Sequence, residues 1–251
     1  MISLQELCTY LDDLLEAKLI KDFCPNGLQV EGKKEIKKVA VAVSASLKTI
    51  ELFVESGAEA LIVHHGMFWN RDDYAITGTK LRKLQLLIEN KLSLLGYHLP
   101  LDFHKELGNN YKAAQDMGWK DLQPFTLYEG YPCGVMGTFS PISVQEFQDK
   151  LETYYKHPAH VALGGKERIC SAALISGGAH KQIYDAVRCG VDCFITGSFD
   201  EPIWHAAHEE GIHFMAMGHS ATETVGPKAI GQRLHEKFGL EWEFLDVPNP
   251  F

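Results

Sequence analysis

Several features that would classify a protein at once are missing from this sequence. No run approaches the ~18 apolar residues that a membrane-spanning helix needs, and the amino terminus is typical of a capped amphipathic helix rather than a signal peptide. The six cysteines contain no CxxC pair, which favours buried reduced thiols over a thiolate metal site or a disulfide framework. We therefore expect a cytoplasmic protein with no membrane partner.

The sequence also has fewer basic residues than acidic residues. The chain has 24 Lys and Arg against 33 Asp and Glu, and its formal net charge is −9. Sequence-independent binding to nucleic acid depends on clustered positive charge, so this balance argues against a nucleic acid as the main partner. With 251 residues and a hydrophobic fraction of 45%, the chain can bury two modest cores or one large core.

The sequence contains an internal repeat. Short motifs of the first half return in the second half in the same order, which indicates a duplicated unit over residues 1–131 and 132–251. The matching pairs are Ser3-Leu-Gln-Glu6 with Ser143-Val-Gln-Glu146, Gly57-Ala-Glu-Ala-Leu-Ile62 with Gly190-Val-Asp-Cys-Phe-Ile195, and His98-x-x-x-Asp102 with His219-x-x-x-Glu223.

Each repeat is predicted to be a helix followed by alternating strands and helices. The first helices begin at the capping boxes Ser3/Glu6 and Ser143/Glu146. The apolar runs that follow are too continuous for half-exposed strands, which favours parallel sheets covered by helices on both faces. We therefore expect an α/β fold of two similar lobes with mainly parallel sheets. The predicted strands are 39–43, 60–63, 92–97, 169–175, 193–196 and 212–217, and the predicted helices between them are 47–55, 80–91, 179–188 and 201–210.

Histidines and carboxylates directly follow these strands. In open α/β sheets ligands bind beyond the carboxyl ends of the strands, which makes these side chains candidates for a site. A mixed nitrogen and oxygen donor set suits Zn, Fe, Mn or Co rather than Ca. Adjacent strand residues point to opposite faces, so we expect the two neighbouring histidines to leave the strand at Gly66 and to serve different ions. The candidates are His64, His65, His98, Asp102, His219 and Glu223.

Structural interpretations compete with this one. A single histidine at a strand end, such as His98, is commonly a hydrogen-bonded structural residue. Ser220-Ala-Thr-Glu223 also matches a capping box, in which Glu223 would only satisfy a helix terminus. Asp102 occupies the same register in the first repeat without a preceding Ser, so capping does not account for both acids.

A glycine-rich turn follows the first buried strand of the second repeat. Ser176-Gly177-Gly178 could let backbone N–H groups approach an anionic substrate at a helix start. A tight turn without a ligand is the alternative, because the residues do not form a G-x-G-x-x-G motif. The first repeat has Ser44-Ala45-Ser46 at this place, so the fold itself does not require glycine there.

Six motifs follow one another along nearly the whole chain. They are Pro25-Asn-Gly-Leu-Gln-Val30, Leu61-Ile-Val-His64-His65-Gly66, Tyr97-His98-Leu-Pro-Leu-Asp102, Gly108-Asn-Asn110, Phe194-Ile-Thr-Gly197 and Gly218-His219-x-x-x-Glu223. Together they resemble the NIF-three-like dinuclear-metal family, many of whose members carry the name GTP cyclohydrolase type 2 homologue. The resemblance implies a metal site between the lobes in which His64, His65, Asp102, His219 and Glu223 bind two divalent ions, and a toroidal homohexamer. His98 is not among the usual ligands, so we expect it beside them or as an acid or base.

Two classes of function remain from the sequence. In the first, a metal-dependent hydrolase-like protein acts on a nucleotide or another small anionic compound through a metal-bridged hydroxide. A GTP cyclohydrolase type 2-like reaction is one version of it, implied by the family resemblance alone. In the second, a non-catalytic assembly or interaction protein holds metals that are structural or stored.

Overall fold

The computed structural model describes residues 1–251, which form two compact units. The first unit comprises Met1–Leu101 and Gly226–Pro248, and the second comprises Asp102–Val225 and Asn249–Phe251. The predicted repeats, 1–131 and 132–251, do not coincide with these units. A boundary at residue 131 would cut a hairpin between two paired strands, and the end of the chain returns to complete the first sheet.

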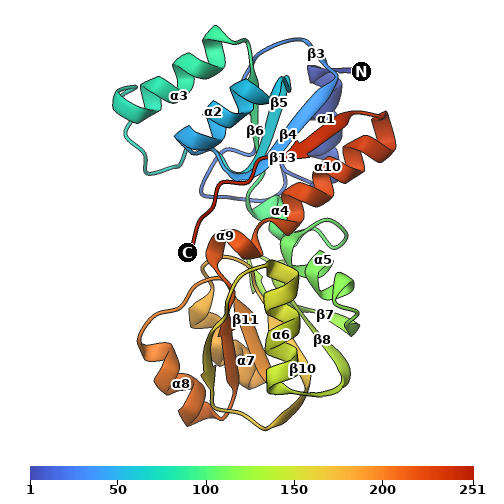
Figure 1. Cartoon of the computed structure of the whole chain (residues 1–251), viewed down its shortest axis with the longest axis vertical. Helices are drawn as coiled ribbons and strands as arrows, with labels where there is room; N and C mark the ends of the chain where they lie inside the picture. Colours follow the sequence, from blue (N-terminus) through green and yellow to red (C-terminus); the bar gives the residue numbers. More distant parts are fainter. The chain divides into compact units, whose positions relative to one another are not determined.

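The first unit is built around a five-stranded sheet with the order β13-β4-β5-β6-β2. Figure 1 labels β13, β4, β5 and β6 of this sheet. All neighbours are parallel except β2, which runs antiparallel to β6 at the edge. The elements of this unit are β1 (Ile2–Ser3), α1 (Leu4–Leu14), β2 (Gly27–Val30), β3 (Glu35–Ile36), β4 (Lys38–Ser44), α2 (Leu47–Ser56), β5 (Ala60–His65), α3 (Gly78–Glu89), β6 (Ser93–Gly96), α10 (Val225–Phe238) and β13 (Glu241–Phe244).

Alternate residues of the central strands face two different cores. Val39 and Val41 of β4 pack with Leu7 of α1 and Leu234 of α10 on one face. The intervening alanines of β4 pack with residues of α2 and α3, such as Phe53, on the other face. Burial on both faces explains why the strand sequences are continuously apolar.

The second unit contains a six-stranded sheet with the order β7-β8-β10-β11-β12-β9. Only β10, β11 and β12 are mutually parallel, while β8 and β9 run antiparallel to their neighbours. The expectation of mainly parallel sheets is therefore correct for the first unit and wrong for the second. Helix α4 (Leu99–Phe103) leads into this unit, whose further elements are α5 (Asn109–Asp116), β7 (Lys120–Tyr128), β8 (Tyr131–Ser143), α6 (Val144–Tyr155), β9 (His160–Leu163), β10 (Arg168–Leu174), the 3-10 helix η1 (His180–Gln182), α7 (Ile183–Cys189), β11 (Cys193–Thr196), α8 (Pro202–Glu210), β12 (His213–Ala216) and α9 (His219–Thr222).

Helices cover both faces of this second sheet as well. Ala172 and Leu174 of β10 pack with α6 through Leu151, whereas Ala173 packs with α7 and α8 through Ile183 and related residues. The predicted helix over 179–188 is divided, because η1 precedes α7. No helix of the chain combines the length and apolar character that crossing a membrane requires.

The two units use the repeated motifs in the same way. In each, three parallel strands are followed by an antiparallel edge strand, β4-β5-β6-β2 and β10-β11-β12-β9. The acid before the second parallel strand also makes equivalent hydrogen bonds in both units. Glu59 accepts them from the backbone of Lys37 and Lys38, and Asp192 accepts them from that of Cys170 and Ser171. The two sheets therefore share a strand order, and the duplication itself stays a prediction from the sequence.

Candidate metal centre

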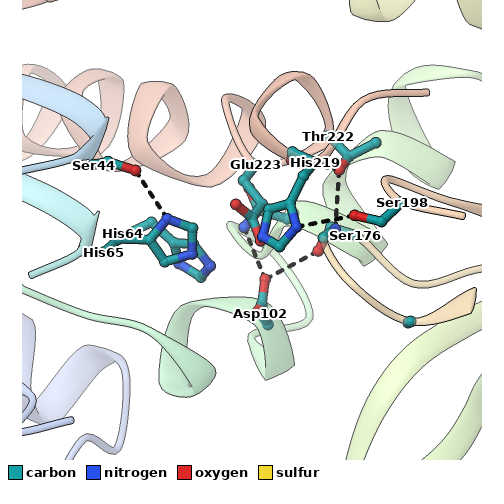
Figure 2. A network of polar contacts seen from close by, with 12 residues as sticks. Ser44, His64, His65, Asp102, Ser176, Ser198, His219, Thr222 and Glu223 are labelled. Atoms are coloured by element: carbon teal, nitrogen blue, oxygen red, sulfur yellow. Dashed lines mark hydrogen bonds and ion pairs between the residues drawn. The ribbon is translucent and has the colours of Figure 1, made fainter. Parts of the chain in front are cut away.

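The predicted site residues fall into two groups, one in each unit. His64, His65 and His98 belong to the first unit, and Asp102, His219 and Glu223 belong to the second together with the Ser176–Gly178 turn. Figure 2 labels residues of both groups.

His64 and His65 are the last two residues of β5. The sequence placed them after the strand, but the pairing of β4 with β5 continues to Ser44 and His65, which extends the strand. Their ring centroids are nevertheless 4.7 Å apart. Side chains in strands lean along the strand direction, which allows both imidazoles to approach each other at its end.

Both rings are held through their Nδ1 atoms. His64 is fully buried, and its Nδ1 lies 3.2 Å from the carbonyl oxygen of Tyr97. A carbonyl only accepts, so this Nδ1 carries the hydrogen and the neutral ring keeps its lone pair on Nε2. The Nδ1 of His65 lies 2.9 Å from Ser44 Oγ. A dashed line marks this contact in Figure 2.

His98 joins these two histidines from the segment between β6 and α4. Its ring centroid is 5.0 Å from that of His64 and 5.6 Å from that of His65. One ring nitrogen of each of the three histidines lies within 4.8 Å of the other two. The structure therefore brings together all three predicted donors of the first unit.

Asp22 holds His98 in place. Its carboxylate accepts from His98 Nδ1 at 2.8 Å, from the Leu99 N–H at 2.9 Å and from Asn26 Nδ2 at 3.0 Å. Burial alone would raise the pKa of Asp22, but the hydrogen bond and the charge of His98 and the other donors outweigh burial and lower it. Cys24 lies beside this pair, and burial together with Asp22 raises the pKa of its thiol to about 12.

In the second unit, Asp102 projects from α4 toward the glycine-rich turn. Its Oδ1 accepts from Asn109 Nδ2 at 2.8 Å and from Ser176 Oγ at 3.1 Å. The side chain of Asn110 also binds this region, because its Oδ1 accepts from the Ser176 N–H at 2.7 Å. These contacts fix the orientation of the Asp102 carboxylate (Figure 2).

His219 and Glu223 stand at the two ends of the short helix α9. His219 Nε2 lies 3.2 Å from Glu223 Oε1, and the Glu223 side chain is only 4% exposed. His219 Nδ1 contacts Ser198 Oγ at 3.1 Å. The capping-box alternative is wrong, because Gly218 is the N-cap of α9 and Glu223 follows its last residue.

Two of the backbone N–H groups in the Ser176–Gly178 turn, where an anionic substrate was expected to bind, donate to side chains of the protein. The N–H groups of Ser176 and Gly177 already donate to Asn110 and Thr222. A Cβ on Gly177 would overlap Glu223 Oε1 and lie 3.3 Å from His219 Nε2. Because Gly177, at φ +66, has no Cβ, the side chains of Glu223 and His219 can occupy this space.

The donor chemistry fits a divalent transition ion. An imidazole lone pair and a carboxylate oxygen only 3.2 Å apart repel each other unless a proton or a cation lies with them. Metal-binding histidines characteristically have their second ring nitrogen held by an oxygen, and His64, His65, His98 and His219 all do so.

Several of these supporting residues were missed by the sequence reasoning. Ser44 and Ser198 hold ring nitrogens, and Asp22 and Asn26 hold His98. Asn26 lies inside the quoted Pro25–Val30 motif, whereas Asp22 stands in an irregular segment that carries no periodic signal.

Fold and donors define an α/β protein that displays histidines and carboxylates at the carboxyl ends of its sheet strands. The model of the Duf34/NIF3 (NGG1p interacting factor 3) family matches residues 2–250, and the chain belongs to this family. A relative from Chlamydia pneumoniae named "GTP cyclohydrolase 1 type 2 homolog" is 48% identical, with 100% of both chains covered.

The chain also resembles solved structures over its whole length. The chain resembles protein ybgI, described as of unknown function, with a TM-score of 0.93, 37% identity and 100% of both chains covered. It also resembles reduced HcgD from Methanocaldococcus jannaschii, with a TM-score of 0.86, 25% identity and 98% of both chains covered.

Proposed function

We propose that this protein binds two divalent metal ions through His64, His65, Asp102, His219 and Glu223 and hydrolyses a nucleotide or another small anionic compound. The observation that carries the proposal is the closeness of His219 Nε2 to Oε1 of the buried Glu223, at 3.2 Å, because an imidazole and a carboxylate together form a donor set that suits a divalent transition ion. The names of the relatives support a nucleotide as substrate, with a GTP cyclohydrolase type 2-like ring opening as one version.

Divalent ions at such a site would ionise water near neutral pH and neutralise charge that develops on a substrate oxygen. The residues of this chain supply the ligands and keep them oriented. The Tyr97 carbonyl keeps the His64 lone pair on Nε2, and Asn109 and Ser176 hold the Asp102 carboxylate. His98 remains a candidate acid or base, and the Ser176–Gly178 turn a candidate substrate contact.

Metal content and turnover test this proposal together. Purified protein loaded separately with Zn, Fe, Mn or Co should contain about two ions per chain and should hydrolyse members of a panel of nucleotides and phosphoesters. His65→Ala should abolish turnover and lower the metal content while the oligomer persists. Ser143→Ala is a matched control, because Ser143 caps α6 and has no contact with the donors.

The alternative function is a non-catalytic protein whose metals are structural or stored. Stoichiometric metal without turnover of any compound, combined with a loss of thermal stability in His65→Ala, would favour it over the enzyme. We further propose that the chain works in the cytoplasm as a homo-oligomer, with the toroidal hexamer that the family resemblance implies. Light scattering on a sizing column measures that assembly directly.

A further inference from the structure

The first unit contains more imidazole donors than the proposed ligand set uses. His98 is the third ring of the cluster that His64 and His65 begin, and one nitrogen of each ring lies within 4.8 Å of the others. The ring of His98 is 15% exposed, so it is neither a packed core side chain nor a surface residue. The role of this third ring requires an explanation.

The carboxylate that holds this histidine in place, that of Asp22, is buried. The Asp22 side chain is only 2% exposed, and removing a carboxylate from water is costly unless hydrogen bonds replace the lost hydration. Those hydrogen bonds converge on His98 and its neighbour: the ring Nδ1 and the Leu99 N–H donate to Asp22. Asn26 bridges the two residues, because it donates to Asp22 and accepts from the His98 N–H at 2.8 Å.

This arrangement fixes both the position and the tautomer of the ring. A carboxylate accepts only, so His98 Nδ1 carries the hydrogen, and in the neutral ring Nε2 holds the lone pair. The carbonyl of Tyr97 has the same effect on His64. Carboxylate–histidine pairs of this kind are the usual support of a metal-bound imidazole, and they raise its basicity.

We propose that His98 is a third imidazole ligand, that Asp22 is its positioning residue, and that residues 1–101 thereby contain a three-histidine metal site. This inference rests on the proposed metal binding but adds a ligand and a separate site to it. Three neutral imidazoles suit Zn and Co and leave a coordination position open for water or substrate. The first unit would then bind one ion without the carboxylates of the second unit.

Trp69 offers an internal reporter of this site. Its ring centroid is 5.2 Å from that of His98, in an edge-to-face arrangement, and 5.9 Å from that of His65. A paramagnetic ion bound by these histidines should quench the fluorescence of Trp69, and Trp69→Phe removes that signal. The other tryptophans, at positions 119, 204 and 242, provide the constant background.

The experiment uses the full-length chain with the second-unit donors removed by Asp102→Asn, His219→Ala and Glu223→Gln. Titration of this background variant with Co²⁺ should show one ion per chain, followed by visible absorption and by Trp69 quenching. Adding His98→Gln should weaken binding by at least ~10-fold and change the Co²⁺ spectrum. Adding Asp22→Asn should weaken it by ~10- to 100-fold with the spectrum retained, because the ligands remain but their support is reduced.

Cys24→Ser is the matched control, because Cys24 lies beside Asp22 and His98 and is the competing donor. It should leave affinity and spectrum unchanged, whereas a thiolate ligand would give a Co–S charge-transfer band that this variant abolishes. Circular dichroism checks that each variant is folded, and Asp22→Asn keeps the test informative if His98→Gln unfolds.

Three results would overturn the inference and leave the proposed function intact. In the first, wild-type protein binds two ions and the background variant binds none. In the second, adding His98→Gln leaves the metal affinity of the background variant unchanged, and in the third the Co–S band appears. Wild-type protein that takes up no ion would instead refute the proposed function.

Discussion

Gly177→Ala should separate the metal site from the fold more cleanly than removal of a ligand. Gly177 adopts a left-handed conformation, and an added Cβ would overlap Glu223 Oε1 and approach His219 Nε2 to 3.3 Å. The substitution therefore acts on two donors at once without changing either side chain. Because Glu223 is almost completely buried, its carboxylate has little room to move away.

The expected magnitudes have two parts. A left-handed alanine costs roughly 1–2 kcal/mol of unfolding free energy. The carboxylate must also retreat by about 1 Å to reach an ordinary van der Waals separation, and a displacement of this size is enough to spoil a preorganised site. We expect metal affinity at the His219–Glu223 donors to fall by ~10- to 100-fold, as it does when a supporting contact of a ligand is lost.

Gly190→Ala is the matched control for this prediction. Gly190 lies in the same unit with φ +71, and a Cβ there would meet no atom within 4 Å. Both variants should lose the stability that a left-handed alanine costs, and Gly177→Ala should lose more because its Cβ overlaps Glu223. Only Gly177→Ala should lose metal affinity in calorimetric titration. Equal metal affinity in the two variants would refute the argument that Gly177 makes room for the donors.

Three further predictions concern two supporting side chains, Ser198 and Asp192, and the removal of bound metal. Ser198→Ala removes the oxygen that contacts His219 Nδ1 and should lower metal affinity by about 10-fold, with Ser140→Ala as an unconnected control in the same unit. Asp192→Asn should cost about 1–3 kcal/mol of unfolding free energy at pH 7, because hydrogen bonds from Cys170, Lys166 and Ser171 outweigh burial and hold the pKa of Asp192 below its usual value. A depressed pKa stabilises the fold above the unfolded-state pKa, so the wild-type advantage in urea denaturation should shrink as pH falls through the acidic range and should not grow there. Chelation should lower Tm by roughly 5 to 10 °C relative to protein at a free metal concentration of ~100 times Kd, where binding contributes about 2.7 kcal/mol; an unchanged Tm would contradict ligation by the folded state.

Local sequence signals predicted the regular elements that carry the donors. The apolar run 39–43 became β4 and the predicted strand 169–175 became β10, because burial on both faces leaves a continuous hydrophobic pattern. The hairpin of β7 and β8 was not predicted. Its strands are partly exposed and contain shifts in register, so no regular alternation marks them.

The sequence allowed the candidate donor residues of the site to be predicted, but not the contacts that hold them. Histidines and acids at strand ends are visible as residue types, but the hydrogen bonds that orient them are not. Asp22 reaches His98 across 76 positions of sequence, and Ser44 reaches His65 from a neighbouring strand. The exact end of β5 was also missed, because the pairing of Ser44 with His65 depends on the register of β4.

The two units hold the Nδ1 atom of an imidazole with different oxygen atoms. His98 and His219 occupy equivalent positions of the repeat, as do His65 and Ser198. In the first unit the position of Ser198 is taken by another ring, so the support for His98 Nδ1 comes from elsewhere, namely from Asp22. In the second unit the hydroxyl of Ser198 itself contacts His219 Nδ1, and the additional donor is the carboxylate of Glu223. Because Gly197 and Ser198 stand where the first unit has His64 and His65, the second unit keeps one imidazole, His219, beside a carboxylate, whereas the first unit has three imidazoles. Ions held by these two sets would therefore have different ligand charges, and water bound to them would have different acidities.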